Sequence, residues 1–120
     1  MRFMMLMIPK GYEKAAPGAM PDAKAVAAMM KYNEDLARAG VLLSLDGLHP
    51  PSMGARVSFS GGKPKVTDGP FTETKELIAS YAILQVASKE EAIERTEAFL
   101  KLIGGGEIDL WQLYEESDFA

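Results

Sequence analysis

Apolar residues follow two periods along the chain, one typical of strands and one typical of helices. Residues 2–8 are apolar on both alternating sides, with an uninterrupted apolar run after Arg2. Such a run indicates a strand covered on both faces. Helices can cover one face, and a partner subunit is the simplest cover for the other. The two sides are Phe3, Met5 and Met7, and Met4, Leu6 and Ile8.

Two segments carry apolar residues at helical spacing. The first is expected to begin near Pro21 and to end at Gly40, because Pro suits a first helical turn and Gly a left-handed end. The second is expected to begin at Ser88, where Ser-Lys-Glu-Glu matches a capping box, and to stop at the glycines 104–106. The expected core stripes are Val26, Met29, Met30, Asn33, Leu36 and Ala37, and then Ala92, Ile93, Thr96, Phe99, Leu100 and Ile103.

Five further stretches predict strands, at 41–45, 55–59, 64–67, 80–86 and 108–114. Residues 46–51, which end in two prolines, are expected to break the first of them. The second and third flank Ser-Gly-Gly-Lys and predict a small hairpin. The order is β-α-β, hairpin, β-α-β, which is the ferredoxin-like, split βαβ arrangement of an α+β domain. Its helices cover one sheet face only, so we expect a homodimer, packed sheet against sheet or edge to edge.

Length, cysteine content and charge limit the classes of protein to which this chain can belong. A chain of 120 residues is one domain, residues 1–120. No cysteine occurs, which excludes disulfides and thiolate catalysis and fits a cytoplasmic location. The net charge is −4 and the 13 Lys and Arg residues are scattered, so no nucleic-acid footprint is predicted. No segment of about 20 apolar residues occurs, so no membrane span is predicted.

The most informative stretch is 67–76, Thr-Asp-Gly-Pro-Phe-Thr-Glu-Thr-Lys-Glu. Asp-Gly-Pro is turn chemistry, since Asp bonds its own downstream backbone, Gly tolerates positive φ and Pro fixes φ. Together with the Met-rich first strand and residues 39–43, 47–51 and 105–114, this stretch resembles the DGPF-domain branch of the YCII-related family. The resemblance extends over nearly the whole chain.

The resemblance implies a dimeric α+β barrel built from two ferredoxin-like subunits, with a cleft in each near Asp68. Relatives in the wider group are proposed to pair a His with that Asp in an active-site-like pocket, which points to His49 here. Some related small barrels are cofactor-free isomerases, lyases or monooxygenases. The DGPF group is also often linked with alternative sigma factors, which implies a regulatory setting.

His49 is the only histidine, and imidazole takes and gives a proton near neutrality. An Asp68 carboxylate on its other nitrogen would fix the tautomer and stabilise the imidazolium. Two structural alternatives stay open. His49 precedes two prolines and could be an exposed loop residue, and Asp68 precedes Gly-Pro and could be an ordinary Asx-turn residue.

Three residues are candidate substrate contacts. Arg56 could hold a carboxylate with two hydrogen bonds, Phe71 could stack on a ligand, and Glu73 could line a cleft. The structural alternatives are an exposed strand residue, a loop anchor in the core and a solvated loop residue. Asp46, His49 and Asp68 lack the tight spacing of a metal site, so neither metal nor cofactor is predicted.

Two functions compete. The favoured one is a cofactor-independent acid–base enzyme of the isomerase or lyase type, which uses the His–Asp pair on a small organic substrate. The alternative is a non-catalytic metabolite-binding or regulatory protein linked to sigma-factor-dependent transcription. Haem chemistry comes last, because an axial His normally lies on a helix and His49 lies in a loop.

Overall fold

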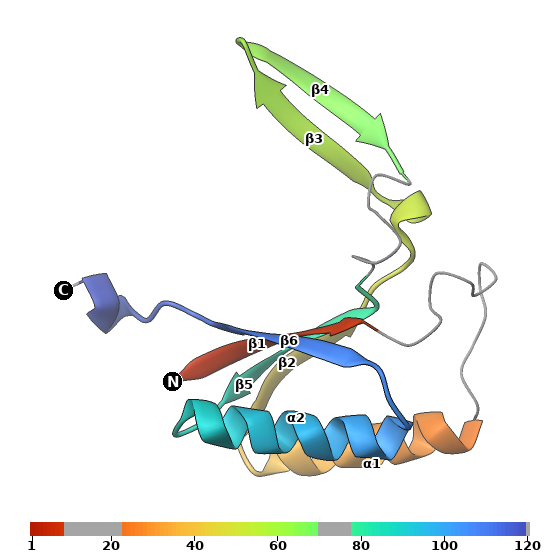
Figure 1. Ribbon diagram of the computed structural model, residues 1–120, viewed down its shortest axis with the longest axis vertical. Helices are drawn as coiled ribbons and strands as arrows, with labels where there is room; N and C mark the ends of the chain where they lie inside the picture. Colours follow the sequence, from red (N-terminus) through yellow and green to blue (C-terminus); the bar gives the residue numbers. More distant parts are fainter. Residues whose placement is uncertain (9–22, 70–77, 120) are drawn as a thin grey trace.

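The computed structural model describes residues 1–8, 23–69 and 78–119. Four strands form one antiparallel sheet, and both helices lie on the same face of it (Figure 1). Two further strands form a separate hairpin. The bounds are β1 Arg2–Ile8, α1 Ala23–Arg38, β2 Leu42–Gly47, β3 Ala55–Ser60, β4 Lys63–Asp68, β5 Ser80–Gln85, α2 Lys89–Ile103 and β6 Glu107–Gln112, with short 3-10 helices η2 Pro51–Met53 and η4 Glu116–Phe119.

The sheet order is β2-β5-β1-β6, so each βαβ unit encloses a strand of the other unit. This is the split βαβ arrangement. The predicted α+β fold with an inserted hairpin is therefore confirmed. The predicted break at Asp46 is wrong, because β2 continues through Gly47. Asp46 pairs with Tyr81 and Gly47 with Ser80, so the neighbouring strand β5 keeps these two residues extended.

The core lies between the sheet and the helices. Phe3 and Leu84 are opposite each other in the pairing of β1 with β5, and their side chains are 3% and 1% exposed. Antiparallel partners share a face, so the alternation predicted for residues 2–8 is confirmed, with Phe3, Met5 and Met7 toward the helices. The buried core cluster is Phe3, Leu36, Val41, Leu84, Val86 and Ala92.

The helix ends follow the local sequence. Ser88 Oγ accepts a hydrogen bond from the Glu91 amide at 3.1 Å, and the Glu91 carboxylate accepts from the Ala87 amide at 3.0 Å, which confirms the capping box. Gly104 ends α2 with φ 85°, a left-handed conformation that favours glycine. The acidic and basic side chains along α1 form the i,i+4 pair of Arg38 with Glu34 at 2.8 Å.

Part of the expected helix stripes is wrong. Met30 and Ala37 of α1 and Ile93 of α2 are exposed. Consecutive helical residues point about 100° apart, so Met29 and Met30 do not both face the sheet. Each helix buries a narrower stripe than the sequence suggests, because it contacts only one sheet face and one other helix.

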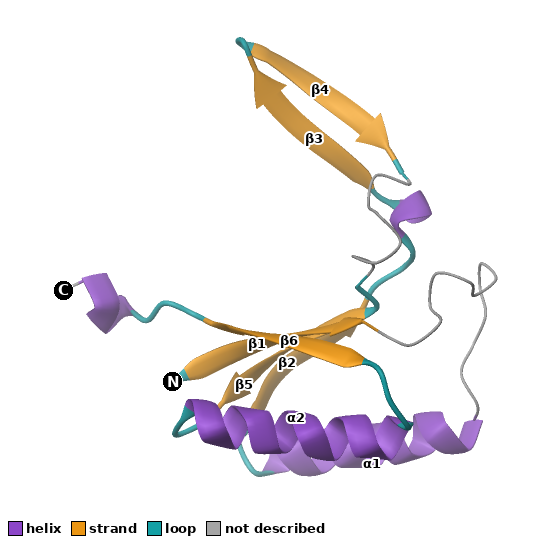
Figure 2. Cartoon of the chain, viewed as in Figure 1, coloured by secondary structure: helices purple, strands orange, loops and turns teal. Residues whose placement is uncertain are grey.

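The chain is extended for its length. Its radius of gyration is 16.4 Å, whereas a compact chain of this length has about 13.6 Å. The cause is visible in Figure 2, where the β3–β4 hairpin stands clear of the sheet on the side away from the helices. We call residues 55–68 the arm and residues 113–119 the tail.

Candidate functional site at the base of the arm

Four strand ends meet at one end of the sheet. Met7, near the end of β1, pairs with Ser80 of β5 and with Ile108 of β6. Gly47, the last residue of β2, also pairs with Ser80. Backbone hydrogen bonds continue beyond the strands, from the Leu48 amide to the Ala79 carbonyl and from the Ala79 amide to the Met7 carbonyl, both at 2.8 Å. The chain leaves β2 toward the arm from this end.

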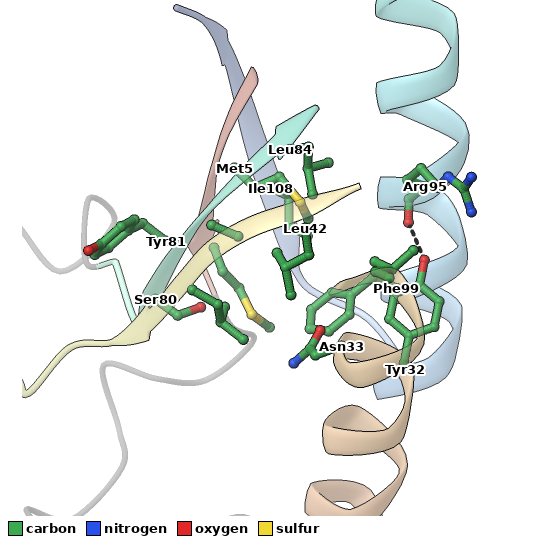
Figure 3. A pocket seen from close by; sticks show the side chains of 14 residues that line it. Met5, Tyr32, Asn33, Leu42, Ser80, Tyr81, Leu84, Arg95, Phe99 and Ile108 are labelled. Carbon is green, nitrogen blue, oxygen red and sulfur yellow. Dashed lines mark hydrogen bonds between the residues drawn. The ribbon is translucent and has the colours of Figure 1, made fainter. Parts of the chain in front are cut away.

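A mainly apolar cavity of about 30 Å³ lies between the sheet and the helices (Figure 3). Its lining includes Met7, Leu45 and Ser80, so the cavity lies at the same end of the sheet. That volume holds about one or two water molecules, which is too small for an organic substrate in this conformation. The other lining residues are Met5, Tyr32, Asn33, Leu36, Leu42, Tyr81, Ala82, Leu84, Arg95, Phe99 and Ile108.

Tyr32 and Phe99 form the helix side of this cavity. Their ring centroids are 5.9 Å apart, and the Tyr32 hydroxyl donates to the backbone carbonyl of Arg95 at 2.9 Å (Figure 3). Burial raises the pKa of Tyr32, and the positive charge of Arg95 partly opposes this shift. Tyr32 therefore stays a neutral hydrogen-bond donor that joins α1 to α2.

A polar cluster lies on the other face of the sheet, at the β2–β5 edge. The Tyr81 hydroxyl donates to Asp46 Oδ2 at 2.6 Å. Hydrogen bonding to the Asp46 carboxylate, together with its negative charge, raises the pKa of Tyr81, and a hydrogen bond with Ser44 acts in the opposite direction. Sequence reasoning treated Tyr81 only as a strand residue. Its pairing with Asp46 depends on strand register, which the sequence alone does not give.

His49 and Asp68 both lie at the base of the arm and both are exposed. His49 follows β2 by two residues, and η2 then leads into β3. Asp68 is the last residue of β4, opposite Ala55. Neither of these two described residues lines the cavity, and no hydrogen bond joins His49 to Asp68. The chain thus brings both to one region, and their pairing stays a prediction.

The candidate substrate contacts are placed only in part. Arg56 lies on β3 opposite Thr67, and its side chain is exposed. Phe71 and Glu73 lie outside the described residues. Within residues 1–8, 23–69 and 78–119, no three His, Asp or Glu side chains gather as a metal site. In the same ranges, neither helix is long and apolar enough to cross a membrane.

Comparison with known proteins bears on the fold and on the family of this chain. A solved structure of 5-chloro-2-hydroxyhydroquinone dehydrochlorinase from Burkholderia phenoliruptrix AC1100, in complex with 2,5-dihydroxybenzoquinone, is similar over 98% of both chains. The TM-score is 0.51 and the sequence identity is 15%, so the likeness concerns the fold alone. No curated protein matches the sequence. The model of the YCII-related domain matches residues 1–99, and the chain therefore belongs to the YCII-related family.

Proposed function

We propose that this protein is a cofactor-independent acid–base enzyme that acts on a small organic substrate at the base of the arm. His49 would take a proton from substrate carbon, and Asp68 would orient the imidazole and stabilise its charged form. One observation supports the proposal: His49 lies between β2 and the hairpin, and Asp68 is the last residue of the hairpin, opposite its first residue Ala55.

The chemistry of the structural neighbour supports this reaction class. A dehydrochlorinase removes HCl from its substrate, so some group must accept the proton. Its complex holds a hydroxylated quinone, a small cyclic compound rich in oxygen. In this chain, the Tyr81 hydroxyl donates its one proton to Asp46 at the same sheet end, so this pair offers no free donor to a substrate oxygen.

The active form in this proposal is a homodimer, the dimeric α+β barrel of the sequence prediction. The sheet face away from the helices carries Met4, Leu6 and Ile83 of β1 and β5, together with Trp111 of β6, which is 62% exposed. We call this the open face. Packing two open faces would remove apolar surface from water and bring a second chain close to each arm base. Arg56, Phe71 and Glu73 are the proposed substrate contacts.

Deuterium exchange tests the base without knowledge of the natural substrate. The protein is mixed in D₂O with 2,5-dihydroxybenzoquinone and a set of small cyclic ketones, and ring-proton loss is followed by NMR. Wild type is expected to accelerate exchange for at least one compound. His49→Gln is expected to slow it by about 10²–10⁴-fold, the usual contribution of a general base. Ser52→Ala, a neighbouring exposed position, is the matched control.

Exchange that is equally fast in His49→Gln would contradict the assigned base. Asp68→Asn is expected to slow exchange less than His49→Gln, because it removes the orienting group and leaves the base. A larger loss in Asp68→Asn than in His49→Gln would assign the proton transfer to the carboxylate instead.

One observation favours the alternative, a metabolite-binding or regulatory protein. His49 and Asp68 are not hydrogen bonded to each other, and both are exposed. In this case wild type catalyses no exchange, and His49→Gln leaves ligand affinity within a few-fold. Isothermal titration of both proteins with 2,5-dihydroxybenzoquinone separates the two functions, since the alternative requires binding without exchange.

A further inference from the structure

The arm is a hairpin with two unlike faces. Val57 pairs with Val66 and Phe59 with Pro64, so these four residues share one face with Ala55. Val57, Phe59 and Val66 are each more than 60% exposed, and Phe59 reaches 74%. An isolated two-stranded hairpin is at best marginally stable in water. The apolar face of the arm is therefore exposed in the described part of the chain, and packing against another surface would stabilise the hairpin.

The tail presents exposed aromatic rings on an ordered support. Tyr114 and Phe119 stack at 5.1 Å between ring centroids, and they are 74% and 75% exposed. Arg2 holds the segment to β1 through an ion pair with Glu115 at 3.0 Å and a hydrogen bond to the Tyr114 carbonyl at 3.2 Å. The Asp118 carboxylate accepts from the Glu115 amide at 2.7 Å.

A groove of about 380 Å³ lies beside these rings, where β6 runs into the tail. It is lined by Gln112, Leu113, Tyr114 and Asp118. The tail thus has a mainly polar hollow beside its exposed rings, large enough to take a side chain from another molecule.

The charges of the two segments are opposite. The arm carries Arg56, Lys63 and Lys65 on the face opposite to the apolar one, and Asp68 on the apolar face opposite Ala55. The tail carries Glu115, Glu116 and Asp118. The arm is only two strands wide, so its charges come within about one Debye length, roughly 10 Å, of any surface that packs on it. Contact between two arms would place like charges together, whereas contact between an arm and a tail would pair opposite charges.

The positions of the two segments allow such an exchange only between chains. The arm rises from one end of the sheet on the side of the open face, and the tail extends outward from the opposite end (Figure 1). When two open faces meet about a twofold axis that exchanges these ends, each arm arrives at the tail of the other chain. A twofold contact of this kind uses the same two patches twice.

The exposed area is also sufficient. The chain exposes 8639 Å², about 2300 Å² more than the roughly 6300 Å² of a compact monomer of this mass. Stable homodimers bury roughly 2,000–5,000 Å² in total from both chains. The extra exposed area of one chain is therefore within the range of area that a stable dimer buries.

We propose that the apolar face of the arm of one chain packs against the tail of a second copy, and that its own tail receives the arm of that copy. This proposal rests on the homodimer of the proposed function and not on its acid–base chemistry. In this arrangement, the geometry of the arm base, which holds His49 and Asp68, depends on the partner chain.

Cross-linking tests the arrangement directly, because the wild-type chain has no cysteine. Val57→Cys labels the arm, Ser117→Cys labels the tail, and Ala98→Cys labels an exposed position of α2 as control. The double variant Val57→Cys/Ser117→Cys, treated with a short bismaleimide, is expected to give covalent dimers. Peptide mapping is expected to join position 57 to position 117. Each single variant and Val57→Cys/Ala98→Cys are expected to stay uncoupled.

Three outcomes would overturn the arm–tail contact. Efficient coupling of the single variant Val57→Cys would show that arm meets arm. A sedimentation dimer in which the double variant does not couple would show another interface. A wild-type monomer at tens of micromolar would remove the homodimer itself. The deuterium-exchange experiment decides the acid–base proposal separately in each case.

A second variant measures the strength of the contact. Phe59→Asp places a charge in the apolar face of the arm and is expected to raise the dimer dissociation constant by about 30-fold or more, as for the loss of one aromatic anchor. Circular dichroism checks that the sheet and helices are retained. A dissociation constant unchanged in a folded Phe59→Asp protein would also overturn the proposal.

Discussion

Apolar side chains on the two faces of the sheet differ in how far they are buried. On the helix side, Phe3 and Leu84 are almost fully buried within one chain. On the open face, the neighbouring strand positions hold Met4 and Ile83, which are only half-buried, because both helices lie on the other face of the sheet (Figure 1). The difference teaches that one subunit buries one face of its sheet, whereas in our proposal the other face packs against a second copy.

The largest expected effect comes from matched truncations on β1. Phe3→Ala is expected to lower the free energy of unfolding by about 3–5 kcal/mol, because a buried ring leaves a cavity. Met4→Ala, on the open face, is expected to cost about 1 kcal/mol or less in dilute protein. Urea denaturation of both variants makes the comparison. Equal losses would mean that a single chain already buries both faces.

The open face itself is tested by a charge. Leu6→Asp is expected to weaken the dimer by about 30-fold or more, because a carboxylate would be desolvated in an apolar contact. Analytical ultracentrifugation gives the dissociation constant. Trp111 is the only tryptophan and lies on this face, so its emission is expected to shift to the blue as wild type is concentrated. An emission maximum independent of concentration would argue that the face stays exposed.

Removing one serine hydroxyl from α2 and one from the arm is expected to give a smaller difference in stability. Ser88→Ala removes the cap of α2 and is expected to cost about 1 kcal/mol, the usual value for a lost N-cap. Ser58→Ala, on the exposed arm, is expected to change stability by less than about 0.5 kcal/mol. Thermal unfolding followed by circular dichroism measures both. A larger effect at Ser58 would show that the arm belongs to the cooperative core of the monomer.

The smallest expected effect concerns pH and the open-face edge. The pKa of Tyr81 is raised above its ordinary value of 10.0, chiefly by its hydrogen bond to Asp46. A group whose pKa is raised on folding contributes stability below its unfolded pKa and loses it as pH rises through the folded one. Wild type should therefore lose its small advantage over Tyr81→Phe above about pH 10. Tyrosinate absorbance and parallel unfolding curves measure the change. A gap that persists at higher pH would contradict the assignment.

Local sequence signals predicted the elements well and their pairing partly. The alternation in residues 2–8, the capping box at Ser88 and the glycine at 104 each act through neighbouring residues, so periodicity and cap chemistry reveal them. The extension of β2 through Gly47 was missed, because it depends on hydrogen-bonded pairing with a strand more than thirty positions away.

The candidate site was less accessible to sequence reasoning for the same reason. The Tyr81–Asp46 hydrogen bond exists only because β2 and β5 meet in one register. The unpartnered apolar face of the arm likewise becomes visible only when the hairpin is seen to stand away from its own sheet. Sequence patterns name the side chains, and their surroundings are set by tertiary structure.

The central position of β1 also has a consequence for folding kinetics. Met4 pairs with Trp111, so the middle of the sheet closes only when residues more than a hundred positions apart in the chain meet. Such a closure between distant parts of the chain must overcome a loop-closure entropy before it gains contacts, which slows folding relative to a helical bundle. On a ribosome, β1 would have to wait for β6 to emerge, and its apolar run would need shielding from other chains throughout that interval.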